Sequence, residues 1–598
     1  MFPYEKARKG QKEAIRYIKK NLGKKIFLRA PTGFGKTIVA LLAHSEVDKV
    51  IYAVRTRNEI TPVIRELRRI GEGFSFIFSA AKMCPLMKGK SSELNDFWLG
   101  CKILRSRGMC PYFNKLQKVS SDEIRKIIYG AATNDPHLLA EAITKKMEVC
   151  PFFALKMLSS ESRFTVVTYP YVFRDEVYET AFDPELKPIM HLILDEAHTL
   201  FNPQLIIDEE INRINVFRAL QECRRHRVAE AVVKYLESID DVLQGIRSRL
   251  LKRIPKDAIF SGLETLMMLE DAALQIKLRK MKEGGPQELL RRGTELTKIL
   301  RFIKYVARED FNVYGQVSPY EEKVIKALTP RMSYIHSSIN QYAGALIMSG
   351  TLPSEEIVET VLFPESVYVD VREDFGFTFP EYNTYYAVYT SLTSRYVKRV
   401  EDTYKGYSSM IRSLVNVLSE GVALVVYPSY SFLKKVHEYL YLPGTFQVVE
   451  GVNTTTGWID ELRKRKKGVI HAVSGGKITE GIEVIDEGGK SLIKLVVVCG
   501  VPYPMPDDYI KDLREWLRKN VGETMAKEFV MNVQAGIKVA QAIGRAIRSE
   551  DDRAFIVLAD HRFMSRRLMS ALGIRYDKVT GDIEELVNDF TSFQKNLL

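Results

Sequence analysis

The chain has 598 residues, of which 46% are hydrophobic and 27% charged, and a formal net charge of +13. It is too long for a single hydrophobic core, so we expect several domains of ordinary size. Its start has no apolar secretory region and its apolar runs are too short to cross a bilayer. These features count against a secreted or membrane protein and predict a cytoplasmic one.

The excess of basic residues modestly favours a polyanionic partner such as nucleic acid, although many basic surfaces are solvated and bind no polyanion. The chain has six cysteines and no export signal. We therefore expect a reducing compartment, where disulfides are rare.

A series of short apolar runs, each followed by turn residues and then by a helical pattern, predicts parallel strands covered on both faces. In chain order they are "KIFLRAPTG", "KVIYAVRT", "FTVVTYP", "HLILDEA", "ALIMSGT", "ALVVYPS", "GVIHAVSGG", "IKLVVVCGVP" and "RAFIVLAD". One set lies before about residue 205 and at 340–365, the other at about 420–560. The predicted fold class is α/β, with two doubly wound parallel-sheet domains.

Two stretches interrupt the first set of strands. Residues 80–150 are rich in Lys, Arg, Cys and turn residues and show little strand pattern. Residues 205–340 have apolar residues at helical spacing and are broken near the middle by the loop "KEGGPQE". We interpret both stretches as insertions into the first domain, the second of them mainly helical.

The first strand is followed directly by "APTGFGKT", residues 30–37. A glycine-rich turn that opens a helix points backbone N–H groups at phosphates. In this pattern Lys36 reaches the β- and γ-phosphates of ATP, and the Thr37 hydroxyl holds Mg²⁺. The strand before the turn and the helix after it disfavour the alternative of a chance turn.

The run "LILDEAHTL" ends a buried strand with two carboxylates. Asp195 is placed to bind Mg²⁺, and Glu196 to orient and deprotonate the attacking water. An Asp-Glu pair at a strand end is common by chance, but after a phosphate-binding loop the combination is specific. His198 is interpreted either as a sensor of the nucleotide state or as a packed structural histidine.

Near the end of the second domain stands "QAIGRAIRSEDD". Gln541, Arg545 and Arg548 have the spacing of one helical face. Such a face, brought against a γ-phosphate, supplies positive charge to the transition state. An ordinary basic helix is the alternative, and an ATP site in a cleft between the two domains accounts for all three motifs together.

In this order, "APTGFGKT", "DEAH", "SGTLP" (349–353), "EGIE" (480–483) and "QAIGRAIR" resemble the motifs of superfamily 2 helicases. With the two insertions and the cysteines, the chain resembles the XPD family of iron–sulfur DNA helicases over essentially its whole length. The resemblance implies two RecA-like motor domains. It also implies an iron–sulfur cluster domain and a mainly helical arch domain inserted in the first of them.

The implied domain boundaries follow the insertions. They are motor domain 1 at 1–80, 156–205 and 336–370, the cluster domain at 81–155, the arch domain at 206–335, and motor domain 2 at 371–598. Two departures from the family pattern stand out: "SGTLPS" differs from the usual SGTLSP order, and Glu483 occupies the usual place of Asp. The second departure leaves the coupling role of Glu483 open.

The resemblance extends to the nucleotide site, where Arg8 and Gln11 match an adenine-recognising element before the phosphate-binding loop. The residues predicted to bind ATP are Arg8, Gln11, Ala30, Pro31, Thr32, Gly33, Phe34, Gly35, Lys36, Thr37, Asp195 and Glu196. Lys36, Glu196, Gln541, Arg545 and Arg548 are the predicted catalytic residues, and Thr37 and Asp195 the predicted Mg²⁺ ligands.

Cysteines 84, 101, 110 and 150 form no C-x-x-C pair, and three of them precede proline. Their spacing fits a zinc ribbon poorly and slightly favours a [4Fe–4S] cluster over zinc or over core cysteines. The resemblance implies that Cys84, Cys101, Cys110 and Cys150 hold such a cluster. Redox chemistry is the alternative to a structural role, and we favour the structural role because a sequence does not reveal a tuned potential. Cys223 and Cys499 are interpreted as small core residues.

Single-stranded nucleic acid is expected to cross loops at the carboxyl ends of the strands. The predicted contacts are Arg55, Thr56, Arg57, Ser474 and Lys477 to the backbone, and Tyr169, within "TYPYVF", by base stacking. Core packing is an equal alternative for the aromatic residues.

The resemblance implies a monomeric, ATP-dependent DNA helicase that moves 5′→3′ on single-stranded DNA and unwinds forked DNA, in repair of the nucleotide-excision type. The alternatives are a single-strand translocase or RNA remodeller, and a scaffold or redox-sensing subunit with a vestigial ATPase. A vestigial ATPase is disfavoured because the chain retains Lys36, Glu196 and Arg548.

Overall fold

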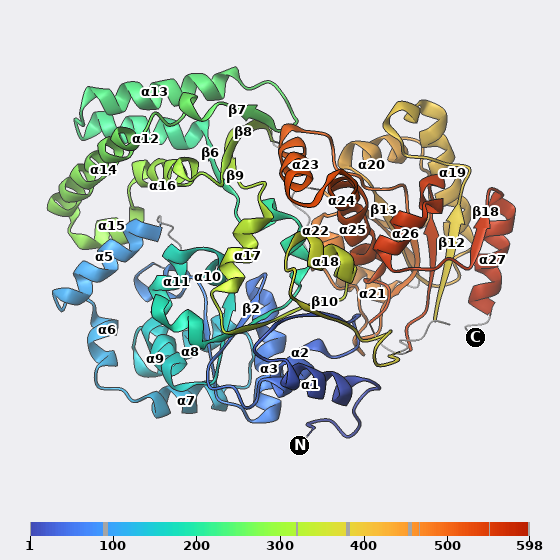
Figure 1. The fold of residues 1–598 in the computed structure, drawn as a ribbon, viewed down its shortest axis with the longest axis horizontal. Helices are drawn as coiled ribbons and strands as arrows, with labels where there is room; N and C mark the ends of the chain where they lie inside the picture. The colour runs from blue at the N-terminus through green and yellow to red at the C-terminus, as the bar shows by residue number, and fades with distance from the viewer. Residues whose placement is uncertain are drawn as a thin grey trace.

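The computed structural model describes residues 2–87, 94–318, 321–377, 383–451, 457–465, 467–548 and 551–595. Within these ranges the strands form two large parallel sheets and one small antiparallel sheet (Figure 1). No helix in the described ranges is long and apolar enough to cross a membrane.

The first large sheet has seven strands in the order β11-β1-β10-β5-β2-β4-β3, and every pairing is parallel. Its strands are β1 (Lys25–Arg29), β2 (Val50–Val54), β3 (Phe74–Ile77), β4 (Phe164–Thr168), β5 (His191–Leu194), β10 (Gly344–Ser349) and β11 (Val367–Asp370). Its helices are α1 (Gln11–Lys20), α2 (Lys36–Ala43), α3 (Ile60–Ile70), α9 (Pro151–Glu161), α10 (Pro170–Phe173), α11 (Asp175–Ala181), α17 (Met332–Asn340) and α18 (Glu355–Val361). The doubly wound first domain is confirmed.

The second large sheet also has seven parallel strands, in the order β14-β15-β13-β16-β17-β12-β18. They are β12 (Thr384–Tyr389), β13 (Gly421–Tyr427), β14 (Phe446–Val449), β15 (Lys467–Val473), β16 (Ile493–Val498), β17 (Ala554–Leu558) and β18 (Lys578–Thr580). The helices are α19 (Glu401–Val417), α20 (Tyr430–His437), α21 (Trp458–Lys464), α22 (Lys477–Gly481), α23 (Asp508–Val521), α24 (Glu523–Glu528), α25 (Gln534–Ile543), α26 (Arg566–Leu572) and α27 (Ile583–Lys595). Every strand predicted from an apolar run is present.

The first insertion contains only helices within its described residues, as its lack of strand pattern predicted. They are α4 (Ala80–Met83), α5 (Leu94–Ser106), α6 (Pro111–Leu116), α7 (Ser121–Gly130) and α8 (Pro136–Met147). Prolines open α6 and α8, where a residue without an N–H costs the helix no hydrogen bond.

The second insertion is mainly helical, as predicted, but it also contains an antiparallel sheet that the sequence analysis missed. The sheet order is β6-β9-β8-β7. The elements are β6 (Glu209–Asn212), α12 (Arg213–Arg225), α13 (Glu230–Gly245), β7 (Lys252–Ile254), α14 (Leu263–Gly284), α15 (Pro286–Arg292), α16 (Glu295–Ala307), β8 (Asn312–Val317) and β9 (Lys323–Leu328). The predicted break is confirmed, because Gly285, with φ 70°, separates α14 from α15.

The two insertions are joined through α5 and α15, which lie side by side (Figure 1). Gly100 allows this close approach, since a Cβ there would lie 3.0 Å from the Leu290 nitrogen. Beside it the carboxylate of Asp96, fully buried, lies 2.8 Å from Lys277 Nζ and accepts hydrogen bonds from the Thr294 amide and the Thr297 hydroxyl. A buried carboxylate satisfied in this way ties the first insertion to the second.

We therefore expect Asp96→Ala to destabilise the junction by about 3 kcal/mol, because the Lys277 ammonium would stay buried without its partner. Amide hydrogen exchange of α15 and α16 should become faster while exchange of the second large sheet stays unchanged. The control is Lys234→Ala, which removes an exposed pair with Glu230 and should cost under about 0.5 kcal/mol. Unchanged exchange at α15 in Asp96→Ala would refute the assignment.

Candidate nucleotide site between the two large sheets

The loop between β1 and α2 has the geometry of a phosphate-binding turn. Residues Ala30, Pro31, Thr32, Gly33, Phe34 and Gly35 form the turn, and Lys36 and Thr37 begin α2. Gly33 and Gly35 have φ of 88° and 83°, in the left-handed region that favours glycine. The turn therefore leaves the amino end of α2, where backbone N–H groups lack helical partners, free for an anion.

Gln11 braces this turn from α1. Its buried side-chain amide donates to the Phe34 carbonyl at 2.6 Å and accepts from the Arg8 amide at 2.8 Å. A Cβ at Gly35 would lie 2.6 Å from Gln11 Nε2, so only glycine fits there. The structure thus brings Gln11 to the loop, while the Arg8 side chain is exposed. Their part in adenine recognition stays a prediction.

The two carboxylates follow β5, opposite the turn. Asp195 Oδ2 accepts from the Tyr52 hydroxyl at 2.8 Å and Oδ1 from the Glu196 amide at 2.9 Å. Burial, together with the charge of Glu196, raises the pKa of Asp195. For Glu196, burial is outweighed by the contact with His198 and by the charge of Lys36, so its pKa is lowered. Glu196 is therefore ionised near neutral pH, as a base for water must be.

The backbone at Glu196 is strained, with φ 53° in a residue that is not glycine. This conformation turns the chain sharply after the strand, and it leaves the side chain 42% exposed. The neighbouring strand β10 continues the site, because the Ala30 amide donates to the Ser349 carbonyl at 3.1 Å. The phosphate-binding turn, the carboxylates and the "SGT" segment therefore share one edge of the first sheet.

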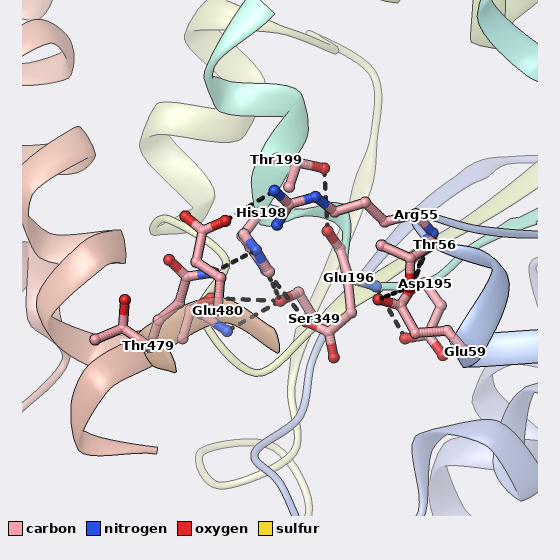
Figure 2. Close-up of polar contacts among 12 residues, drawn as sticks. Arg55, Thr56, Glu59, Asp195, Glu196, His198, Thr199, Ser349, Thr479 and Glu480 are labelled. Atoms are coloured by element: carbon pink, nitrogen blue, oxygen red, sulfur yellow. Dashed lines mark hydrogen bonds and ion pairs between the residues drawn. The ribbon is translucent and has the colours of Figure 1, made fainter. Parts of the chain in front are cut away.

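His198 connects this edge to the second sheet (Figure 2). Its buried ring lies 2.9 Å from Ser349 Oγ and 3.3 Å from Glu196 Oε2 through Nδ1, and 2.7 Å from Gln541 Nε2 through Nε2. An amide nitrogen can only donate, so the imidazole accepts through Nε2 and carries its proton on Nδ1. His198 is thus a packed residue that also contacts both halves of the site.

The expected single helical face of Gln541, Arg545 and Arg548 is wrong. Helix α25 ends at Ile543, because Gly544 is a weak helix former, so the two arginines lie beyond the helix. Arg545 Nε donates to the Thr479 carbonyl at 2.8 Å, and Arg548 Nη1 lies 3.4 Å from Glu483 Oε1. Burial and the charge of Arg548 lower the pKa of Arg545 to about 10, so it stays cationic.

The loops predicted to touch nucleic acid lie at the carboxyl ends of β2 and β15. Arg55 Nη2 lies 2.8 Å from Glu480 Oε2, an ion pair between the two large domains (Figure 2). Thr56 is exposed and caps a short helical turn with Glu59, and the Arg57 guanidinium lies 5.8 Å from the Phe78 ring centre. The sequence analysis missed Glu480 and Ser349 as individual residues, although it quoted both motifs that contain them.

The second of these loops, residues 473–478, is held by a buried carboxylate. Glu450 accepts from the Val473 amide at 2.7 Å and from the Ile478 amide at 3.1 Å. Within the loop, Ser474 is half-buried and Lys477 is exposed at the start of α22. The loop is therefore preformed, with Lys477 accessible to a phosphate.

The structure contradicts base stacking by Tyr169 and favours the packing alternative. Tyr169 is only 5% exposed, its ring packs 5.5 Å from that of Phe173, and its hydroxyl donates to the Asp195 carbonyl at 2.6 Å. Both ring faces are therefore inside the protein, and the hydroxyl supports the carboxylate turn. The neighbouring Tyr171 and Phe173 are buried too.

Cysteines 84, 101, 110 and 150 line one pocket with an empty volume of about 440 Å³. Cys110 and Cys150 stand directly before α6 and α9, each opened by a proline, which explains the Cys-Pro pattern. The walls include Trp98 and Phe153. Burial raises the pKa of Cys84 and Cys150 to about 12. Cys223 and Cys499 are buried in other cores, as predicted.

These thiols surround a space rather than a point. Among the described residues, no group of three or more His, Cys, Asp or Glu side chains is close enough to hold one metal ion. A single zinc ion requires four ligands at about 2.3 Å from one centre. A cluster is larger than one ion and is held by several thiolates, so a pocket whose possible metal ligands are four thiols fits a cluster better than zinc.

Two family models match the chain: "DEAD_2" at residues 52–213 and "Helicase C-terminal domain" at residues 411–573. The "ATP-dependent DNA helicase XPD" of Sulfolobus acidocaldarius is 29% identical over 90% of this chain and 93% of its own. The Saccharomyces cerevisiae "General transcription and DNA repair factor IIH helicase subunit XPD/RAD3" is 20% identical, over 95% and 87%. A solved structure titled "XPD_Helicase" has 26% identity and a TM-score of 0.74 over 96% of this chain and 100% of its own.

The fold and the site define a two-domain helicase motor with an ATP site between two RecA-like sheets. The chain is an ATP-dependent DNA helicase of the XPD type, similar to a named XPD helicase over 90% of its length.

The burial of Tyr169 is tested by two substitutions. Tyr169→Phe removes one buried hydrogen bond and should cost about 1 kcal/mol, whereas Tyr169→Ala empties a core position and should cost about 4 kcal/mol. Thermal unfolding should show a small and a large fall in melting temperature. Affinity for single-stranded DNA should be unchanged in Tyr169→Phe. An Ala variant with normal stability and weakened DNA binding would restore the stacking interpretation.

Proposed function

We propose that this helicase moves 5′→3′ along single-stranded DNA, unwinds forked DNA as a monomer, and serves DNA repair of the nucleotide-excision type. The observation that carries the proposal is a set of contacts around the cleft. His198 contacts Gln541 and Arg55 contacts Glu480 across the cleft, and Arg545 contacts Thr479, the neighbour of Glu480, within the second domain. Similarity to relatives named as DNA helicases supports the substrate and the repair role.

ATP would bind with its phosphates at the amino end of α2, where Lys36 follows the turn. Thr37 and Asp195 would hold Mg²⁺, which neutralises phosphate charge. Glu196, ionised and exposed toward the cleft, takes the proton of the attacking water. Arg545 remains cationic after burial and approaches from the second domain, where it can stabilise charge in the transition state.

Movement follows from the same contacts. Hydrolysis removes the γ-phosphate that the cationic groups of both domains share, so the two sheets separate and close again with each ATP. The Thr479–Glu480 segment contacts Arg545 on one side and Arg55 on the other, and this supports coupling between the nucleotide and the strand. Arg55, Thr56, Arg57, Ser474 and Lys477 are the proposed backbone contacts.

The proposed domain plan assigns the cluster domain to 81–155 and the arch domain to 206–335, between the parts of motor domain 1. We assign a [4Fe–4S] cluster to Cys84, Cys101, Cys110 and Cys150, on the strength of the all-thiol pocket. The cluster would cross-link the helices of the first insertion and so fix their packing. We propose a cytoplasmic location.

Glu196→Gln keeps the shape of the site but removes the base. We expect normal ATP binding and no unwinding. DNA-stimulated ATP hydrolysis should fall at least about 100-fold, because general-base catalysis typically contributes that much to a rate. Steady-state ATPase and forked-DNA unwinding measure this. The matched control is Glu46→Gln, on an exposed carboxylate paired with Lys19. Near-normal unwinding by Glu196→Gln would overturn the catalytic assignment, and equal activity on RNA forks would overturn the DNA assignment.

Cys101→Ser tests the cluster at the one ligand without a following proline. Anaerobically purified protein should contain about four irons per chain and no zinc, and the variant should lose iron and visible absorbance. Unwinding should be lost while some ATPase remains, because the nucleotide site lies on the large sheets. Cys223→Ser, in a separate core, should keep its iron. Stoichiometric zinc in the wild-type protein would contradict the assignment.

A further inference from the structure

A second pocket lies between the two large domains, outside the nucleotide site. It has an empty volume of about 350 Å³. One wall is the segment after the DEAH motif, with Phe201, Asn202 and Leu205, and the other is α25, with Gln534 and Lys538. The phosphate-binding turn and both catalytic carboxylates are not among its lining residues. The pocket therefore lies beside the ATP site and adjoins it through His198, Thr199 and Gln541.

Polar atoms in the walls of this pocket lack partners. Gln534 is 6% exposed, and its Nε2 has no hydrogen bond. Asn202 Oδ1, from the opposite wall, is also buried without a partner. An unsatisfied buried donor or acceptor costs about 1–3 kcal/mol, and such groups are rare in proteins. One donor and one acceptor facing a common cavity indicate a ligand that supplies the complementary groups.

Lys538 adds an unpaired cation. It is half-buried, and burial lowers its pKa, yet it has no ion pair among the described residues; the nearest charge that acts on it is Glu480. Glu480 itself is engaged by Arg55 at 2.8 Å. The loop at Gly475 lies beside both side chains, since a Cβ there would lie 3.6 Å from Lys538 Cε and 3.7 Å from Glu480 Oε1. The lysine is thus beside the loops proposed to hold the DNA backbone, and its charge is free for a phosphate.

Three of the lining residues, Phe201, Leu205 and Ile537, are apolar. Phe201 and Ile537 line the pocket, and Leu205, 48% exposed, reaches solvent from the same wall. A flat apolar ring with a polar edge matches the chemistry of this lining, and every nucleobase has a π-face and an edge with both donors and acceptors. A free cation beside it matches the phosphate of the same nucleotide. Because every base edge carries donors or acceptors, one donor and one acceptor can bind any base. A motor that moves along all sequences requires this tolerance.

We propose that this pocket receives one base of the tracked single strand, held at its edge by Gln534 and Asn202, while Lys538 binds the adjoining phosphate. The inference rests on the proposed DNA helicase function and adds a base-binding subsite to it. Because the two walls belong to different domains, opening and closing of the cleft would release and grip that base once in each ATP cycle.

The test uses the full-length protein and forked DNA, whose junction fixes the register of the tracked strand. One abasic residue is moved along that strand, and affinity is measured by fluorescence anisotropy with a non-hydrolysable ATP analogue. In the wild type we expect one position at which loss of the base weakens binding about tenfold. In Gln534→Leu that position-specific loss should disappear, whereas Gln275→Leu, on exposed α14, should retain it.

A second measurement isolates the phosphate. Each phosphate contact to a single strand contributes about −0.7 to the slope of log K against log salt concentration. Lys538→Met should reduce the slope by about 0.7 relative to wild type, and Lys234→Met, on α13, should not change it. Gln534→Leu retaining the wild-type abasic profile, or Lys538→Met retaining the wild-type slope, would overturn the subsite. Failure of the wild type to bind or unwind forked DNA would instead overturn the proposed function.

Discussion

The motor depends on one contact across the cleft, the 2.7 Å approach of Gln541 Nε2 to the unprotonated nitrogen of His198. The imidazole can accept only while it is neutral, and it stays oriented because Nδ1 is beside Ser349 Oγ and Glu196 Oε2. One side chain therefore contacts Glu196, the strand next to the phosphate-binding turn, and helix α25 of the second domain. Any change in the charge of Glu196 alters a contact that holds the two domains together.

Most central strands could be predicted from sequence because burial on both faces demands continuous apolar residues. The central strand β12 (Thr384–Tyr389) was missed, because its first half carries Thr and Tyr and is only half-buried. The edge strands β14 (Phe446–Val449) and β18 (Lys578–Thr580) were missed because they are short, partly exposed and interrupted by polar residues. The antiparallel sheet of the second insertion was not predicted from the sequence, for a related reason. Its strands, such as β6 (Glu209–Asn212), carry charged residues and lie between long helices whose pattern dominates the region.

Site residues whose role follows from local backbone geometry could be predicted from the sequence. Residues whose role depends on a contact between the two domains could not. The glycines of the turn follow from the positive φ that the loop requires. Glu480 becomes significant only through its ion pair with Arg55, which lies 425 residues earlier in the chain. For Tyr169 the sequence predicted a DNA contact that the structure does not support. An aromatic residue at a strand end has the same sequence pattern whether it stacks on a base or is buried beneath the carboxylate turn.

The cysteine pocket and the junction of the two insertions are in direct contact through α5 and α15. Leu290 of α15 lines the pocket, and the same helix rests on Gly100 of α5, one residue before Cys101. Burial raises the pKa of the Cys84 and Cys150 thiols to about 12, so they remain protonated at neutral pH unless a strong positive centre compensates. The proposed cluster would displace these protons on binding and would cross-link α5 to the other helices of the pocket. Because Asp96 lies on the same helix and contacts the second insertion, loss of the proposed cluster would also disturb the junction with α14 and α16.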